Sequence, residues 1–229
     1  MGKRLITQRR GRGGSHYRSP SHRHVDDVRL PQFDEGVGTI KDLIQAPGRT
    51  SPLAVIDFKG VTDYQLAVAG TKVGQKIYVG GDKATAGNIT ILSKIPEGTA
   101  VHNVEAKPGD GGKYAKTAGA SATIVSRGEA VMVLMPSGAM KEFNPNCRAA
   151  IGIVAGGGRG DKPLAKAGKN YHTLRSRSTA NKKVSGVAMN AVDHPHGGGS
   201  HPHVGGPNCQ KRTASPGQKV GFLPKKKRK

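Results

Sequence analysis

Residues 53–69 read LAVIDFKGVTDYQLAVA and contain two apolar runs on either side of Gly60, Val61 and Thr62. In the second run the apolar residues Tyr64, Leu66 and Val68 alternate with Asp63, Gln65 and Ala67. This period of two is typical of a strand with one buried face. Residues 53–59 and 63–69 therefore predict an antiparallel hairpin, and the fold is expected to be built around it.

Residues 75–79 (QKIYV) continue this pattern and are followed by the turn residues Gly80, Gly81 and Asp82. The region has several short strand-like runs, no convincing long helix, and turn signals about every eight to twelve residues. Such a pattern is typical of a small antiparallel barrel. Residues 31–86 are therefore expected to form a barrel resembling the OB fold.

A second group of strand-like runs follows the first. It comprises residues 88–95, 100–105, 122–126, 129–134, 139–143 and 149–154. Turn sequences such as Pro96-Glu97-Gly98 separate the runs. We expect a second small barrel, SH3-like in size, over residues 87–165. The predicted fold is therefore mainly β: an OB-like barrel followed by an SH3-like barrel, with long irregular basic N- and C-terminal extensions.

Charge is concentrated in the two extensions. The chain has 37 Lys plus Arg against 15 Asp plus Glu, a formal net charge of +22. Residues 1–30 contain eight basic and two acidic residues, and residues 159–229 contain sixteen and two. The middle is nearly neutral. This distribution indicates a polyanionic partner, against which the extensions 1–30 and 166–229 are expected to become ordered.

Composition excludes other classes of protein. Hydrophobic residues make up 34% and aromatic residues 4%, which favours two small domains over one large core. The chain lacks an apolar run near the roughly 18 residues of a membrane span, and its start, MGKRLITQRR, lacks a secretory h-region. We expect a soluble intracellular protein with no membrane partner. Cys147 and Cys209 form no CxxC pair, so reduced thiols are expected.

Each extension has one distinctive local pattern. The arginines of the N-terminal extension are separated by Gly, Ser and Pro, which suits threading between phosphates, although a solubilising tail is the alternative. Residues 164–177 (LAKAGKNYHTLRSR) are the best helix candidate, with a thin apolar stripe typical of a short basic helix lying on RNA. The terminal PKKKRK resembles a nuclear import signal but also fits an RNA-binding run.

Residues 185–209 (SGVAMNAVDHPHGGGSHPHVGGPNC) combine four histidines with a run of three glycines and three prolines. This composition argues against helix or strand and indicates a loop that an outside partner orders. A zinc site, with the histidines and Cys209, lacks a rigid scaffold. Acid–base catalysis by Asp193 and His194 is disfavoured because adjacent extended residues point to opposite faces. Contact with RNA needs neither arrangement and is favoured.

Several blocks of the chain resemble the large-subunit ribosomal protein family L two, of archaeal type. They are RRGRGG, IPEGTAVHNVEAKPGDGGKYAKTAGASATIV, NCRAAIGIVAGGGRGDKP and GVAMNAVDHPHGGG, in this order over most of residues 8–205. The resemblance implies the two barrels, extensions that penetrate large-subunit ribosomal RNA (rRNA) near the peptidyl-transferase region, and roles in subunit association and tRNA binding. It implies no enzymatic activity and no cofactor.

The expected function is that of a structural constituent of the large ribosomal subunit in the cytoplasm. Its expected partners are large-subunit rRNA, other ribosomal proteins, the small-subunit rRNA at an intersubunit bridge, and tRNA. The alternatives are a basic DNA-binding protein of chromatin type and a histidine-dependent enzyme. No metal ligand and no catalytic residue is predicted. The predicted rRNA-binding residues are Arg9, Arg10, Arg12, Arg18, Arg23, Lys113, Lys116, Arg159, Lys162, Lys166, Lys169, Arg175, Arg177, Lys182, Lys183, Asp193, His194, His196, Gly197, Gly198, Gly199, Lys211 and Arg212.

Overall fold

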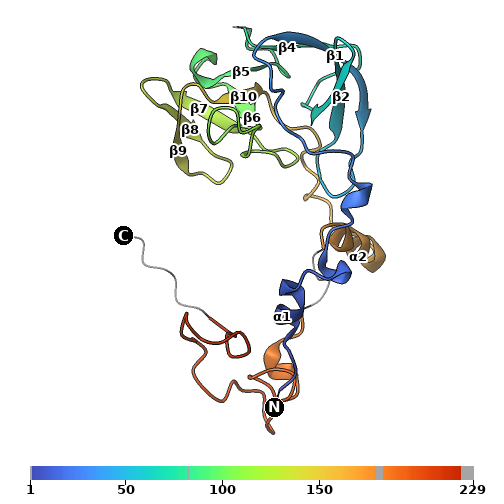
Figure 1. The fold of residues 1–229 in the computed structure, drawn as a ribbon, viewed down its shortest axis with the longest axis vertical. Coiled ribbons are helices and arrows are strands. Elements are labelled where there is room, and N and C mark those ends of the chain that lie inside the picture. The colour runs from blue at the N-terminus through green and yellow to red at the C-terminus, as the bar shows by residue number, and fades with distance from the viewer. Residues whose placement is uncertain (1, 82, 179–182, 223–229) are drawn as a thin grey trace. The chain divides into compact units, whose positions relative to one another are not determined.

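The structure of the chain is a computed structural model, and it describes residues 2–81, 83–178 and 183–222. It divides into two compact units. One unit is His22–Pro163, and the other combines Met1–Ser21 with Leu164–Lys229. The strands of the described residues all belong to the first of these, which we call the β unit; the second is called the terminal unit (Figure 1).

The β unit contains ten strands in one continuous sheet. They are β1 (Gly36–Ile44), β2 (Leu53–Phe58), β3 (Val61–Leu66), β4 (Lys76–Val79), β5 (Ile89–Ile91), β6 (Ala100–His102), β7 (Ala122–Ser126), β8 (Val131–Leu134), β9 (Met140–Phe143) and β10 (Arg148–Ile151). Their order is β3-β2-β1-β4-β5-β10-β6-β7-β8-β9, and the neighbours are antiparallel except β4 and β5. In this order β5 and β10 stand between β1–β4 and β6–β9, and Figure 1 shows β5, β6 and β10 close together. The predicted mainly β class is confirmed, and this sheet is consistent with an OB-like fold followed by an SH3-like fold.

The hairpin on which the prediction rested is present as β2 and β3. Leu53 pairs with Leu66 at one end and Phe58 with Val61 at the other. The two residues that connect the strands, Lys59 and Gly60, have φ of 52° and 94°. Positive φ at both central residues matches the right-handed twist of a hairpin.

Buried hydrophobic side chains among the described residues of the β unit form three clusters, and the two larger ones define what we call the first module, around β1–β5, and the second module, around β6–β9. One cluster of buried residues includes Ile40, Ile56 and Ile77 and belongs to the β1–β5 region. Another cluster consists of residues from the part of the chain between β5 and the end of β10 and includes Ile124 and Val133. The side chains in both clusters have almost no exposed surface. Burial of such side chains is the main stabilising contribution to each module, at about 1.5–3 kcal/mol per fully buried aliphatic residue.

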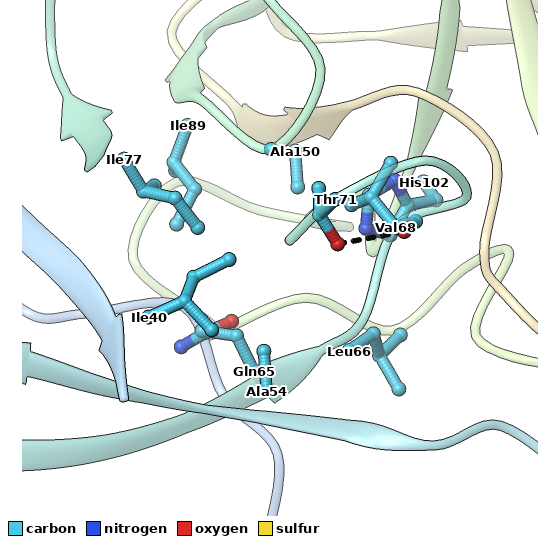
Figure 2. Close-up of a pocket in the computed structure, with 11 residues that line it drawn as sticks. Ile40, Ala54, Gln65, Leu66, Val68, Thr71, Ile77, Ile89, His102 and Ala150 are labelled. Atoms are coloured by element: carbon cyan, nitrogen blue, oxygen red, sulfur yellow. Dashed lines mark hydrogen bonds between the residues drawn. The ribbon is translucent and has the colours of Figure 1, made fainter. Parts of the chain in front are cut away.

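A small cavity lies where residues of the two modules meet (Figure 2). Its lining includes Gln65 and Thr71 from the first module and His102 from β6, and the Thr71 hydroxyl donates to the carbonyl of Val68 at 2.8 Å. The volume of about 10 Å³ is near the minimum that holds one water molecule. This cavity is therefore too small to bind a cofactor or substrate.

Some elements differ from the predicted ones. The longest strand, β1, was not named in the sequence analysis; a register shift between Ile40 and Asp42 interrupts its alternation. Residues 88–95 do not form one strand, because β5 is followed by a 3₁₀-helix, η3 (Leu92–Lys94). The run predicted at 149–154 ends earlier, since Gly152 has φ of 110°, which a strand does not accommodate.

The terminal unit contains the helices α1 (Ile6–Gly11) and α2 (Ala167–Ser176) and the 3₁₀-helices η1 (Ser15–Tyr17) and η4 (Gly186–Ala188). The boundary between the two units falls within the 3₁₀-helix η2 (Ser21–Arg23). α2 confirms the predicted helix. α1 was not predicted, and its first turn is closed by the side chain of Gln8, which accepts from the Leu5 N–H at 2.8 Å. The helices of the described residues are all too short or too polar to cross a membrane.

Candidate nucleic-acid interface

Two cations, Arg49 and Arg29, lie near Lys116 in the β unit. The Lys116 ammonium donates to the carbonyl oxygens of Val28 at 2.7 Å and of Gly112 at 3.1 Å, which uses two of its three donors. Burial lowers the pKa of Lys116, and the nearby positive charges of Arg49 and Arg29 lower it as well, while the carboxylates of Asp27 and Asp110 act in the opposite direction. A partly buried ammonium beside two guanidinium groups is an environment that an anion would stabilise.

The two arginines of this cluster come from other segments of the chain. Arg49, between β1 and β2, donates to the carbonyl of Asp26 at 3.3 Å. Arg29 forms an exposed ion pair with Asp27 at 3.5 Å. Exposed pairs of this kind are worth about 0–1 kcal/mol, so the Arg29 guanidinium can exchange its partner at little cost. Neither arginine was predicted as a site residue; the closest signal for Arg49 is the Pro-Gly turn just before it.

A buried carboxylate fixes the glycine-rich turn that contains Gly112, one of the two residues whose carbonyl accepts from the Lys116 ammonium. Glu105 is fully buried and accepts from the N–H groups of Gly109 and Gly111, both at 3.2 Å. It also pairs with the guanidinium of Arg148 at 3.1 Å, while that guanidinium donates to the carbonyl of Pro31 at 2.7 Å. The turn, β10 and the segment before β1 are thus joined through the pair of Glu105 and Arg148.

Lys113, a predicted site residue, leaves the same turn with its side chain 64% exposed. Its ammonium lies 3.8 Å from Asp110. Burial acts to raise the pKa of Asp110, but backbone N–H donors, including that of Gly112, hold it below its usual value. Asp110 therefore stays ionised and organises the turn, while the charge of Lys113 faces solvent.

The histidine loop, residues 189–199, is folded back on itself and is not extended as expected. The N–H groups of Asp193 and His194 both donate to the carbonyl of Asn190, at 3.0 and 3.2 Å. Gly198 donates to the carbonyl of Met189 at 3.1 Å. A Cβ at Gly197 would lie 2.5 Å from the Asn190 oxygen, so this glycine permits close approach within the loop itself. The loop therefore satisfies part of its own backbone without an outside partner.

Two imidazole rings meet in this loop. The rings of His194 and His196 lie 4.9 Å apart at 65°, and Nδ1 of His194 accepts from the N–H of His196 at 3.0 Å. Burial lowers the pKa of His194, and the neighbouring His196 lowers it further. His194 is therefore favoured as a neutral ring whose Nε2 carries the proton. The ring packs directly against Gly186 of η4, where a side chain would collide with it.

Asp193 does not orient His194. Its carboxylate lies 3.6 Å from the Lys3 ammonium, and the Lys3 N–H donates to the carbonyl of Val192 at 2.8 Å. Nε2 of His196 is buried and has no hydrogen-bond partner among the described residues. Within those same residues, His, Cys, Asp and Glu side chains do not come together in a group of three or more that could hold a metal ion.

The predicted site residues belong to both units. Those in the β unit are Arg23, Lys113, Lys116, Arg159 and Lys162. Those in the terminal unit are Arg9, Arg10, Arg12, Arg18, Lys166, Lys169, Arg175, Arg177, Lys183, Asp193, His194, His196, Gly197, Gly198, Gly199, Lys211 and Arg212. Lys182 and the terminal PKKKRK run lie outside the described residues. The distribution suits an extended ligand rather than a small molecule.

A β unit with partly buried and exposed cations, joined to a strongly basic terminal unit, defines a protein suited to bind a polyanion along its surface. Residues 85–219 match the family described as Ribosomal Proteins L2, C-terminal domain. The chain belongs to this ribosomal protein family, as the sequence blocks predicted.

Curated relatives agree with this assignment over the whole chain. Large ribosomal subunit protein uL2 of Thermoplasma acidophilum is 49% identical over 231 residues, which cover 100% of this chain and 98% of that protein. The same protein from Picrophilus torridus is 48% identical over 231 residues, with the same coverage. That of Archaeoglobus fulgidus is 50% identical over 228 residues, covering 97% of this chain and 96% of the relative.

Proposed function

We propose that the protein is a structural constituent of the large ribosomal subunit in the cytoplasm, where it binds large-subunit rRNA and neighbouring ribosomal proteins. The observation that carries the proposal is the full-length similarity to large ribosomal subunit proteins at 48–50% identity in the three relatives above. The formal charge of +22 supplies the electrostatic attraction that such a role needs.

In the β unit, the cluster of Lys116, Arg29 and Arg49 is the proposed phosphate contact. An RNA phosphate would take the remaining donor of the Lys116 ammonium and replace the weak pair between Arg29 and Asp27. The turn held by Glu105 includes Gly112, whose carbonyl accepts from the Lys116 ammonium, and so helps to position that ammonium before RNA arrives. The other predicted cations, on both units, contact further phosphates in this proposal.

The histidine loop is the proposed contact with the peptidyl-transferase region and with tRNA, and intersubunit contact with small-subunit rRNA is proposed for the same protein. A neutral His194 with its Nε2–H free can donate to a phosphate or a 2′-hydroxyl. This role is one of positioning, without enzymatic activity of the protein itself. His194→Gln keeps hydrogen bonding but cannot titrate. Subunits that carry it should retain most of the peptidyl-transferase rate with an unchanged pH profile, while His194→Ala impairs assembly or tRNA placement.

The proposed function is tested by isolating ribosomal subunits from cells that express the tagged full-length chain. The protein should cosediment with large subunits at physiological salt and leave them only at high salt, because phosphate contacts weaken as salt rises. A chain that sediments free of ribosomes, or with small subunits, would contradict the proposal. The role of His194 is tested on the same preparation by measuring how much of the His194→Gln and His194→Ala variants is incorporated into large subunits.

A further inference from the structure

One face of α2 is left uncovered by the chain and combines an aromatic ring with cationic groups. Gly168, Tyr171, His172 and Arg175 have the i, i+3, i+4, i+7 spacing that places residues on one face of a helix. Tyr171 is 43% exposed, and none of the residues of α2 is buried. The half-buried side chains Thr173, Leu174 and Ser176 lie elsewhere on the helix. The helix therefore turns its larger ring to solvent.

Contacts within this face hold the ring in a fixed direction. The guanidinium of Arg175 donates to the Tyr171 hydroxyl at 3.3 Å. The rings of Tyr171 and His172 lie 5.3 Å apart and nearly perpendicular, at 79°. A cation thus lies beside an aromatic ring that is 43% exposed. Outside its chain neighbours and the helix backbone, Gly168 has no atom within 4 Å of the place its Cβ would occupy, so there is open space at this position.

The surrounding charge identifies the kind of partner. Residues 162–192 contain seven Lys or Arg residues and no Asp or Glu. α2 has no acidic residue in its first turn and no side-chain cap, and its ten residues are too few for a stable isolated helix. A polyanion would neutralise this stretch and supply the packing that the chain does not.

We propose that the exposed face of α2 binds an unpaired nucleotide of RNA, with its base stacked on Tyr171 and its phosphate held by Arg175. Base stacking on tyrosine and phosphate binding by arginine are general features of single-stranded RNA recognition. The inference rests on the proposed function and deepens it, because it names the nucleotide state that this part of the terminal unit selects. Gly168 contributes by leaving room for the sugar–phosphate backbone near the helix.

The test measures binding of the full-length chain to an in vitro transcript of large-subunit rRNA over a range of salt concentrations. Tyr171→Ala should weaken binding by about tenfold, and Tyr171→Phe, which keeps the stacking surface, should stay within about twofold. Arg175→Gln should lower the slope of log K against log salt by about one. The matched control is Tyr78→Ala, which removes a tyrosine of similar exposure, 39%, from β4 and should leave binding unchanged.

The possible outcomes separate the inference from the proposed function. If the parent chain binds with strong salt dependence but Tyr171→Ala binds as tightly as Tyr78→Ala does, the stacking site is refuted and the proposed function stands. If the parent chain does not bind the transcript at physiological salt, the proposed function fails, and the inference fails with it. Because no residue of α2 is buried, these substitutions should leave the far-ultraviolet circular dichroism of the β unit unchanged.

Discussion

Lowering the pH should destabilise the β unit through one buried histidine. His102 is 1% exposed, and its Nδ1 lies 3.0 Å from the carbonyl of Gly152. Burial lowers the pKa of His102 from 6.5 to about 4, against the opposing effect of the Gly152 hydrogen bond. The folded protein therefore keeps this ring neutral at pH values where the unfolded chain already binds a proton.

The sign and size of the effect follow from this difference in pKa. Stability from the neutral ring is fully present above about pH 6.5 and falls as the pH drops toward 4, because the unfolded state then binds more protons than the folded state. A shift of about 2.5 units, at about 1.36 kcal/mol per unit, corresponds to a loss of about 3 kcal/mol.

Urea denaturation of the full-length chain at several pH values between 7.5 and 4.5 measures this loss. The comparison is with His102→Gln, which cannot titrate at this position. As the pH falls, the unfolding free energy of the parent should drop by about 2–3 kcal/mol more than that of His102→Gln. Val133→Ala, a core substitution, is the control and should lower stability by a similar amount at every pH. Parallel pH curves for the parent and His102→Gln would refute the reasoning.

Two further predictions concern glycine and cysteine residues of the β unit. Gly109→Ala and Gly112→Ala both place a side chain at positive φ, but only at Gly112 would the Cβ meet the carbonyl oxygen of Asn103, at 2.5 Å. Gly109→Ala should cost about 1 kcal/mol and Gly112→Ala about 3 kcal/mol or more in denaturation experiments, and equal losses would contradict the close approach. Cys147 is fully buried, and burial raises the pKa of its thiol, whereas Cys209 is exposed. Ellman's reagent should therefore titrate one thiol per native chain quickly, and two fast thiols would show that Cys147 is accessible.

The parts of the fold that could be predicted from sequence are those in which local pattern and tertiary burial agree. The two apolar runs on either side of Gly60 predicted the β2–β3 hairpin, because the strands pair directly across a two-residue turn. The single buried face expected for the second strand was wrong, since burial in β3 rises toward its end and includes both Gln65 and Leu66. β1 escaped prediction because the register shift after Ile40 moves later side chains out of the expected alternation. α1 escaped because the Gln8 side chain, not an apolar stripe, closes its first turn.

The candidate site was predictable to a smaller extent. Basic residues on turns and arms, such as Lys113 and Lys116, stand out by charge alone. Arg49 joins Lys116 only through tertiary folding, since 66 residues separate them in the sequence. The ring of His194 packs against Gly186 and lies next to the ring of His196. An extended loop would not bring these residues together, and the turn at Asn190 that does so was not predicted.

The central claim, that the chain binds large-subunit rRNA mainly through phosphate contacts, is tested most directly by the salt dependence of that binding. Each phosphate contact contributes about 0.7–0.9 to the slope of log K against log salt, so a slope of several units is expected for the parent chain. Deleting residues 2–21, which contain six Lys or Arg and no acidic residue, should lower the slope by at least about two, while Val133→Ala should leave it unchanged. A slope near zero for the parent chain would contradict the account.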